Sequence, residues 1–190
     1  VEMLTDPVER LLRERGPVAL QYGSGQGDVT LREQILDVIG EVGISAHPDD
    51  IVVTTGSQMA LDLVTRVFCN PGDVVLVESP SYVGALGVFR AYECDVVHVA
   101  MDDQGLEPTA LREAIAAVRA SGRAIKLIYT IPSFHNPAGV TQGPERRREI
   151  LAIAREAGIA LLEDDPYGLL GFEGEPPRAI RADDADGVIY

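Results

Sequence analysis

Short apolar strands that alternate with amphipathic helices are the feature that most constrains how this chain can fold. The strand-like runs are rich in Val and Ile and lack clean polar alternation, as expected for strands buried on both faces. The pattern predicts an α/β fold, with a largely parallel sheet between two helical layers. The expected strands are 51–54, 74–77, 95–99, 125–130, 159–162 and 188–190, and the expected helices are 57–68, 84–91, 106–120 and 144–157.

The first 50 residues have a different pattern. They contain a probable helix at 7–15, a Gly-rich link and a second helix at 31–42. We expect residues 1–50 to form an N-terminal segment packed against a sheet domain over residues 51–190.

Charge and composition exclude several classes of protein. The formal net charge of -14 argues against nucleic acid and against an anionic membrane as partners. No apolar run approaches the length of a membrane span, and the start has no basic region leading into a signal-peptide core. We therefore expect a cytoplasmic protein. Cys69 and Cys94 are expected to be reduced thiols that pack in the core rather than a disulfide.

Two groups of polar residues follow the first two predicted strands of the sheet domain. Thr55-Gly56-Ser57-Gln58 lies between a strand and a helix, where free backbone amides can bind a phosphate, although Ser57 alone could simply cap the helix. Tyr82 follows the next strand and could stack on a cofactor ring, although it could equally be a packing residue.

Two further groups follow later strands. Asn136 lies in Asn-Pro-Ala-Gly, and Asp164-Asp165-Pro-Tyr167 follows the strand at 159–162. Each has a simpler explanation, as a turn-forming Asn or as strand-end carboxylates. Their common position after successive strands, however, places them in one ligand crevice. A carboxylate facing a ring nitrogen, together with amide and phenol groups on a ring hydroxyl, fits a pyridine cofactor.

These motifs resemble those of the fold-type I pyridoxal 5'-phosphate (PLP) aminotransferases, over nearly the whole chain. The resemblance implies that Asp164, with Asp165 as a neighbour, pairs with the pyridine nitrogen. It implies that Asn136 and Tyr167 bind the ring hydroxyl. The fold implied is the three-layer large domain of these PLP enzymes, with helices on both faces of a mostly parallel sheet.

The same resemblance assigns the remaining groups. Gly56, Ser57 and Gln58 match the phosphate-binding turn of the family, and Tyr82 matches its stacking aromatic. Tyr22, in Leu-Gln-Tyr-Gly, is similar to the tyrosine that reaches the phosphate in the neighbouring subunit. That match implies a homodimer with shared sites.

In their residues, these motifs most resemble the branch that contains 2-aminoadipate and kynurenine aminotransferases and related regulator domains. The function implied is PLP-dependent transamination between an amino acid and a 2-oxo acid. Two alternatives share the cofactor contacts: a PLP-binding effector domain of a transcription regulator, and a PLP-dependent lyase.

The position of the catalytic lysine is where the chain departs from the family pattern. Lys126 is the only lysine, and it lies within the predicted strand 125–130 rather than at its end. In the family, the Schiff-base lysine lies a few residues beyond a strand that resembles 188–190. We therefore expect this lysine beyond Tyr190, along with the arginines that bind the cofactor phosphate and the substrate carboxylate. The chain is expected to be the large-domain part of a longer enzyme and inactive alone, with no catalytic residue of its own.

Two other functions, a dinucleotide-binding oxidoreductase and a metal hydrolase, have little support. Gly23-Ser-Gly-Gln-Gly27 departs from the dinucleotide-binding glycine pattern and follows no firm strand. His47, His98 and His135 lack the spacing of metal ligands and are expected to be isolated structural or surface residues.

Overall fold

The computed structural model describes residues 2–171 and 174–190. Its centre is a six-stranded sheet in the order β3-β2-β1-β4-β5-β6. All neighbouring strands are parallel except β3, which is antiparallel to β2. The strands are β1 (Val74–Ser79), β2 (Asp95–Asp102), β3 (Gly105–Leu106), β4 (Ile125–Thr130), β5 (Ala160–Glu163) and β6 (Val188–Ile189).

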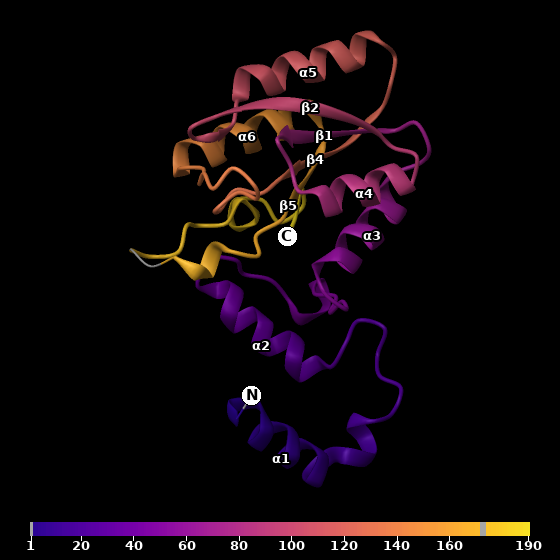
Figure 1. Cartoon of the computed structure of the whole chain (residues 1–190), viewed down its shortest axis with the longest axis vertical. Helices are drawn as coiled ribbons and strands as arrows, with labels where there is room; N and C mark the ends of the chain where they lie inside the picture. The colour runs from indigo at the N-terminus through magenta and orange to yellow at the C-terminus, as the bar shows by residue number, and fades with distance from the viewer. Residues whose placement is uncertain (1, 172–173) are drawn as a thin grey trace.

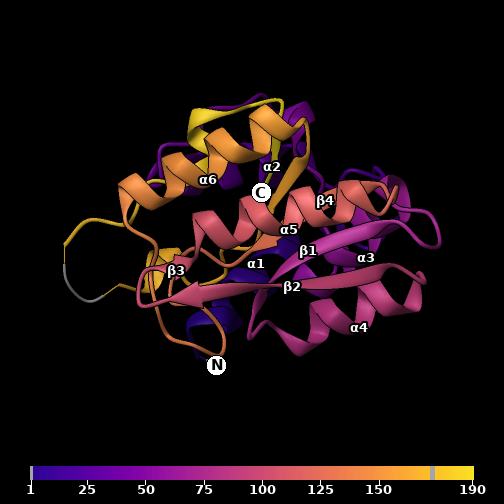
Figure 2. The same cartoon turned by 90° about the horizontal axis from the view of Figure 1, so that it is seen from above.

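Helices cover both faces of this sheet (Figure 2). One face carries α5 (Pro108–Ala120) and α6 (Pro144–Ala157), and the other carries α3 (Ser57–Phe68) and α4 (Val83–Ala91). The predicted α/β fold, with a mostly parallel sheet between helical layers, is confirmed.

The alternation of side chains along β1 shows why the strand is apolar throughout. Val74 and Leu76 belong to the core under α5 and α6, whereas Val75 and Val77 belong to the core under α3 and α4. Successive side chains of a strand point to opposite faces, so a strand covered on both sides needs apolar residues at every position.

The N-terminal segment contains α1 (Glu2–Ala19), α2 (Val29–Gly40) and the short 3-10 helix η1 (Pro48–Asp50). The Asp28 carboxylate caps α2 by accepting hydrogen bonds from the backbone N–H groups of Thr30 and Leu31. Figure 1 shows α1 at the far end of the molecule from the sheet. Its apolar side chains are exposed, namely those of Met3, Leu4, Val8, Leu11, Leu12 and Val18.

At two places the type of secondary structure differs from the expectation. Residues 51–54 were expected to form a strand, but within the described residues they join no sheet, and the Val53 N–H instead donates to Gln26 O at 2.9 Å. β-branched residues favour extended backbone, but a strand also needs a neighbour to pair with. Leu106, expected to begin a helix, instead pairs with β2 as part of β3, so that α5 starts at Pro108.

Several smaller expectations can be compared with the structure. Cys69 and Cys94 are both buried and carry free thiols, in agreement with their expected packing role. Across the part of the chain that is described, no helix combines the length and the apolar character needed to cross a membrane.

Replacing Leu76 by Ala should destabilise the fold strongly. Leu76 is fully buried in the central strand β1, so its truncation leaves a cavity and should lower the free energy of unfolding by about 2–5 kcal/mol. Urea denaturation followed by circular dichroism measures the change. Val67→Ala, at an exposed position of α3, is the control and should change it by less than about 0.5 kcal/mol. Equal effects of the two substitutions would contradict the assigned core.

Candidate cofactor site

The carboxyl ends of β1, β4 and β5 meet at one edge of the sheet. Parallel pairing places Val77 opposite Tyr129, and Thr130 opposite Glu163. The loops that follow these strands carry Tyr82, Asn136 and Asp164. The structure therefore brings three of the predicted groups to the same edge, which is where ligands bind in open α/β sheets.

Asp164 is a partly buried carboxylate at this edge. Its Oδ2 accepts a hydrogen bond from the Tyr129 hydroxyl at 2.7 Å, and its backbone N–H donates to Thr130 O at 3.0 Å. Burial raises the pKa of Asp164, the Tyr129 hydrogen bond lowers it, and the Asp165 charge raises it. Among the described residues no arginine, lysine or histidine forms an ion pair with Asp164, so its charge lacks a cationic partner.

Asn136 and Tyr167 line a common cavity of about 440 Å³. Phe134 and Leu170 contribute apolar walls to it. Neither the Asn136 amide nor the Tyr167 hydroxyl makes a hydrogen bond within the described part of the protein. Both groups are therefore free to bind a ligand in this cavity.

The N-terminus of α3 presents a second set of free donors. Gly56, with φ of 80°, is the N-cap residue, and no side chain caps the helix. Ser57 is the first helical residue, so the simpler reading of Ser57 as the cap is wrong. Gly56 and Ser57 line a cavity of about 530 Å³ that also borders α2 and Tyr190. Uncapped N–H groups at a helix N-terminus suit an anion.

Tyr82 and Gln58 connect this helix terminus to the turn after β1. The Tyr82 hydroxyl lies 3.4 Å from Gln58 Oε1, and Gln58 Nε2 donates to Gly84 O at 3.1 Å. The Tyr82 ring lies directly over Gly84, where a Cβ atom would come within 2.5 Å of it. Glycine at this position allows the ring to approach the backbone.

Two predicted positions lie apart from this group. Tyr22 is fully exposed in the link between α1 and α2, and the structure does not bring it to the other candidates. Lys126 Nζ lies 3.9 Å from Asp73 Oδ2, and Asp73 directly precedes β1. Lys126 therefore lies at the amino ends of the strands, opposite the candidate site.

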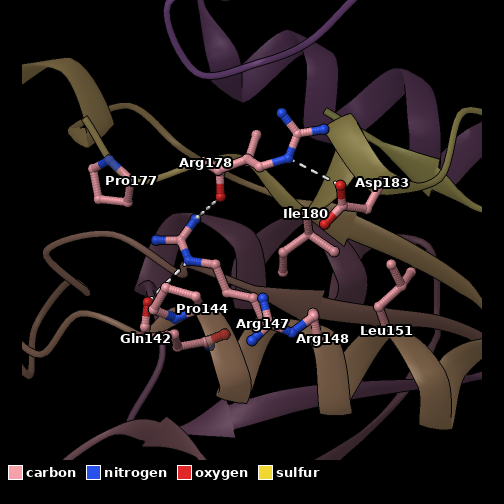
Figure 3. A pocket seen from close by; sticks show the side chains of 10 residues that line it. Gln142, Pro144, Arg147, Arg148, Leu151, Pro177, Arg178, Ile180 and Asp183 are labelled. Carbon is pink, nitrogen blue, oxygen red and sulfur yellow. Dashed lines mark hydrogen bonds and ion pairs between the residues drawn. The ribbon is translucent and has the colours of Figure 1, made fainter. Parts of the chain in front are cut away.

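A buried ion pair behind Asp164 was not foreseen. Arg147 Nη1 lies 3.8 Å from Glu163 Oε1, and both side chains are buried. Figure 3 shows Arg147 donating to the backbone oxygens of Gln142 and Arg178, at 2.9 and 3.1 Å. Burial raises the pKa of Glu163 to about 7 and lowers that of Arg147. The pair fixes Glu163, the residue before Asp164.

The histidine prediction needs one correction. His47 and His98 are exposed, but His135 is only 2% exposed and its Nε2 lies 3.0 Å from Glu78 Oε2, so it is not isolated. The sequence signal was the position of His135 directly before Asn136. No cluster of potential metal ligands occurs within residues 2–171 and 174–190.

Comparison with known proteins agrees with the family resemblance of the sequence motifs. The family model for aminotransferase class I and II matches residues 3–189. The chain is 41% identical to an aromatic-amino-acid aminotransferase of Thermococcus litoralis, and 39% identical to a 2-aminoadipate transaminase of Thermus thermophilus. Each alignment covers all of this chain and 46% of the relative. The chain thus spans about half the length of these curated relatives.

Other matches include a solved enzyme and a regulator. The structure of a Pyrococcus horikoshii kynurenine aminotransferase matches with a TM-score of 0.92 and 41% identity, covering 100% of this chain and 47% of that one. An uncharacterized HTH-type transcriptional regulator of Bacillus subtilis is 32% identical over 97% of this chain and 37% of its own length. The chain belongs to the class I and II aminotransferase family.

Proposed function

We propose that the full protein is a PLP-dependent aminotransferase that moves an amino group between an amino acid and a 2-oxo acid. Residues 51–190 are proposed to form most of its PLP-binding large domain, with residues 1–50 as the N-terminal segment. The observation that carries the proposal is Asp164, a partly buried carboxylate without a cationic partner in the described structure, on the same loop as the free Tyr167 hydroxyl.

The residues present fit the pyridine ring of PLP. A protonated ring nitrogen would supply the positive charge that Asp164 lacks, and Tyr129 holds the receiving carboxylate in place. The Asn136 amide and the Tyr167 hydroxyl are both unbound and line one cavity, so both can donate to a ring hydroxyl oxygen.

The groups near α3 fit the phosphate and the ring face. The uncapped N–H groups of the α3 N-terminus and the Ser57 hydroxyl are suitable donors to a phosphate. Tyr82, held against Gly84, is proposed to stack on the ring. Gln58 links these two subsites through its contacts with Tyr82 and Gly84.

When bound, PLP supplies an electron-withdrawing ring that stabilises negative charge on the substrate carbon. The chain's own contribution is electrostatic. The Asp164 carboxylate keeps a proton on the ring nitrogen, and Asn136 and Tyr167 stabilise the ring oxygen. Phe134 and Leu170 give this cavity an apolar side.

Two further groups, the covalent lysine and a tyrosine from the partner subunit, are proposed from where residues lie in the fold. Lys126 lies at the wrong end of the strands, so we propose that the covalent lysine lies beyond Tyr190 and that residues 1–190 alone cannot catalyse the reaction. We further propose a homodimer in which Tyr22 reaches the partner's phosphate site. The full exposure of Tyr22, together with the exposed apolar side chains of α1, supports this arrangement. The cytoplasmic location stays a prediction.

Asp164→Asn should reduce kcat of the full-length protein at least about 100-fold, because an amide no longer carries the charge that holds the ring proton. Steady-state transamination, with bound PLP determined separately, measures the loss. Asp165→Asn is the matched control and should leave kcat close to the wild-type value. If Asp165→Asn lowers kcat and Asp164→Asn does not, Asp165 rather than Asp164 holds the ring proton. Full activity of both variants would refute the proposed site.

Lys126→Met should leave PLP binding and transamination of the full-length protein intact, because Lys126 contacts Asp73 at the amino ends of the strands. Borohydride reduction followed by peptide mapping should place the label on a lysine outside residues 1–190 in both the wild type and the variant. A label on Lys126 in the wild type would overturn the proposed location of the covalent lysine.

Tyr129→Phe should raise the pKa of Asp164 further, since the lost hydrogen bond stabilised the ionised carboxylate. Because this pKa is already raised on folding, ionised Asp164 costs stability as pH rises through it, and the variant should suffer more. The stability deficit should approach about 1.5–3 kcal/mol at high pH and shrink at low pH, as urea unfolding across a pH series would show. A deficit independent of pH would argue against the bond.

A further inference from the structure

Glu78 is a buried carboxylate near the end of β1 with four donors around it. Its Oε1 accepts from the Thr130 hydroxyl at 2.7 Å and from Gln142 Nε2 at 2.9 Å. Its Oε2 accepts from the Ile131 N–H at 2.8 Å and lies 3.0 Å from His135 Nε2. Glu78 is fully buried, and no arginine or lysine of the described chain lies within ion-pair distance. Such a charge is tolerated only when donors saturate it.

The hydrogen bonds of His135 assign its tautomer. The Ala138 N–H lies 3.3 Å from His135 Nδ1, so Nδ1 must carry a lone pair. The proton of a neutral imidazole is then on Nε2, and the carboxylate oxygen that lies beside it among the described residues is Glu78 Oε2, at 3.0 Å. The pair is therefore an imidazole N–H placed 3.0 Å from a carboxylate oxygen, a close polar contact rather than a fully aligned hydrogen bond.

The loop that carries Asn136 is closed upon itself. The His135 N–H donates to Val140 O at 2.8 Å, and the Gln142 N–H donates to Pro132 O at 2.8 Å. His135 and Gln142, on the two arms of this loop, both direct their side chains to Glu78. One carboxylate thus ties both arms of the loop to the ends of β1 and β4.

The same loop is held from its other side by Arg147. Its Nη2 donates to Pro132 O at 3.1 Å and to Ser133 Oγ at 3.0 Å, and its Nε donates to Gln142 O. Figure 3 shows the Arg147 guanidinium reaching Gln142 from α6. Arg147 therefore fixes the base of the loop, whereas the His135–Glu78 contact is the one adjacent to Asn136.

We propose that Glu78 and His135 are positioning residues that fix the orientation of the Asn136 amide toward the ring hydroxyl of the cofactor. This inference rests on the proposed function. The Asn136 amide makes no hydrogen bond of its own to described residues, so the loop backbone and its anchors set its direction. His135 is joined to Asn136 by a peptide bond, and its ring lies between the Ala138 N–H, which donates to Nδ1, and the Glu78 carboxylate, 3.0 Å from Nε2.

The chemistry of the site makes Glu78 hard to replace. In Glu78→Gln, one of the two acceptor oxygens is replaced by an NH₂ group, which is a donor. The two donors that faced that oxygen in the wild type would then face another donor. His135 cannot relieve the conflict by moving its proton to Nδ1, because the Ala138 N–H already points there. The loop must shift, and Asn136 shifts with it.

The test uses the full-length protein reconstituted with PLP and follows the pH-dependent change in absorbance of the bound cofactor. The Asn136 N–H stabilises the deprotonated ring oxygen and so lowers the midpoint of this change. Asn136→Ala should raise the midpoint by about one pH unit. Glu78→Gln and His135→Leu should shift it in the same direction, with stoichiometric PLP retained. His135→Gln, which keeps an N–H donor near the Nε2 position, should restore most of the wild-type midpoint.

Leu111→Ala is the control for loss of stability alone. Leu111 is a fully buried residue of α5, so this variant should lose stability without moving the midpoint. If Asn136→Ala shifts the midpoint while Glu78→Gln and His135→Leu leave it unchanged, the inference is wrong and the proposed function stands. If Glu78→Gln fails to fold, the two His135 variants provide the test. Equal midpoints for His135→Leu and His135→Gln would then overturn the inference. Failure of the wild type to bind PLP overturns both.

Discussion

The parallel pairing of β1, β4 and β5 is the constraint on which the rest of this structure depends. Parallel strands need long crossover connections, and the helices in most of these connections bury both faces of the sheet. The same pairing sends all three carboxyl ends to one edge, so the loops that follow these strands come together there. The position of the site follows from the direction of the strands.

Two buried carboxylates connect the sheet to the groups that face the site. Glu78 in β1 is saturated by neutral donors and His135, and Glu163 at the end of β5 accepts the Ile180 and Arg181 N–H groups beside Arg147. Buried charges are a poor means of gaining stability, since desolvation opposes their formation. Their directional bonds restrict the loops next to Asn136 and Asp164, which packing by apolar side chains alone does not do.

The candidate groups are distributed over two cavities rather than gathered in one. Asn136 and Tyr167 line the first, and Gly56 and Ser57 line the second. Tyr82 and Gln58 connect the start of α3 to the turn after β1, while Tyr22 and the apolar side of α1 face solvent. The proposed dimer and the proposed lysine beyond Tyr190 would add the groups that these residues do not supply.

The sequence by itself determined the elements and the chemical groups at their ends. Helical periodicity predicted α3 and α6 with the bounds observed, and the apolar run predicted β4, because each of these signals is local. The segment 51–54 failed as a strand because pairing depends on a neighbour that propensity does not describe. The motifs also placed Asp164 and Asn136 at strand ends, where the structure has them.

Only the tertiary structure decided which side chains support Asp164 and the loop that carries Asn136. Tyr129 of β4 reaches Asp164 at the end of the neighbouring strand β5, and His135 meets Glu78 although 57 positions (135 minus 78) separate them in the chain. A side chain on a strand or in a loop carries no local signal of what lies on the next strand. Such partnerships depend on strand order and register, which the packing of the whole sheet determines.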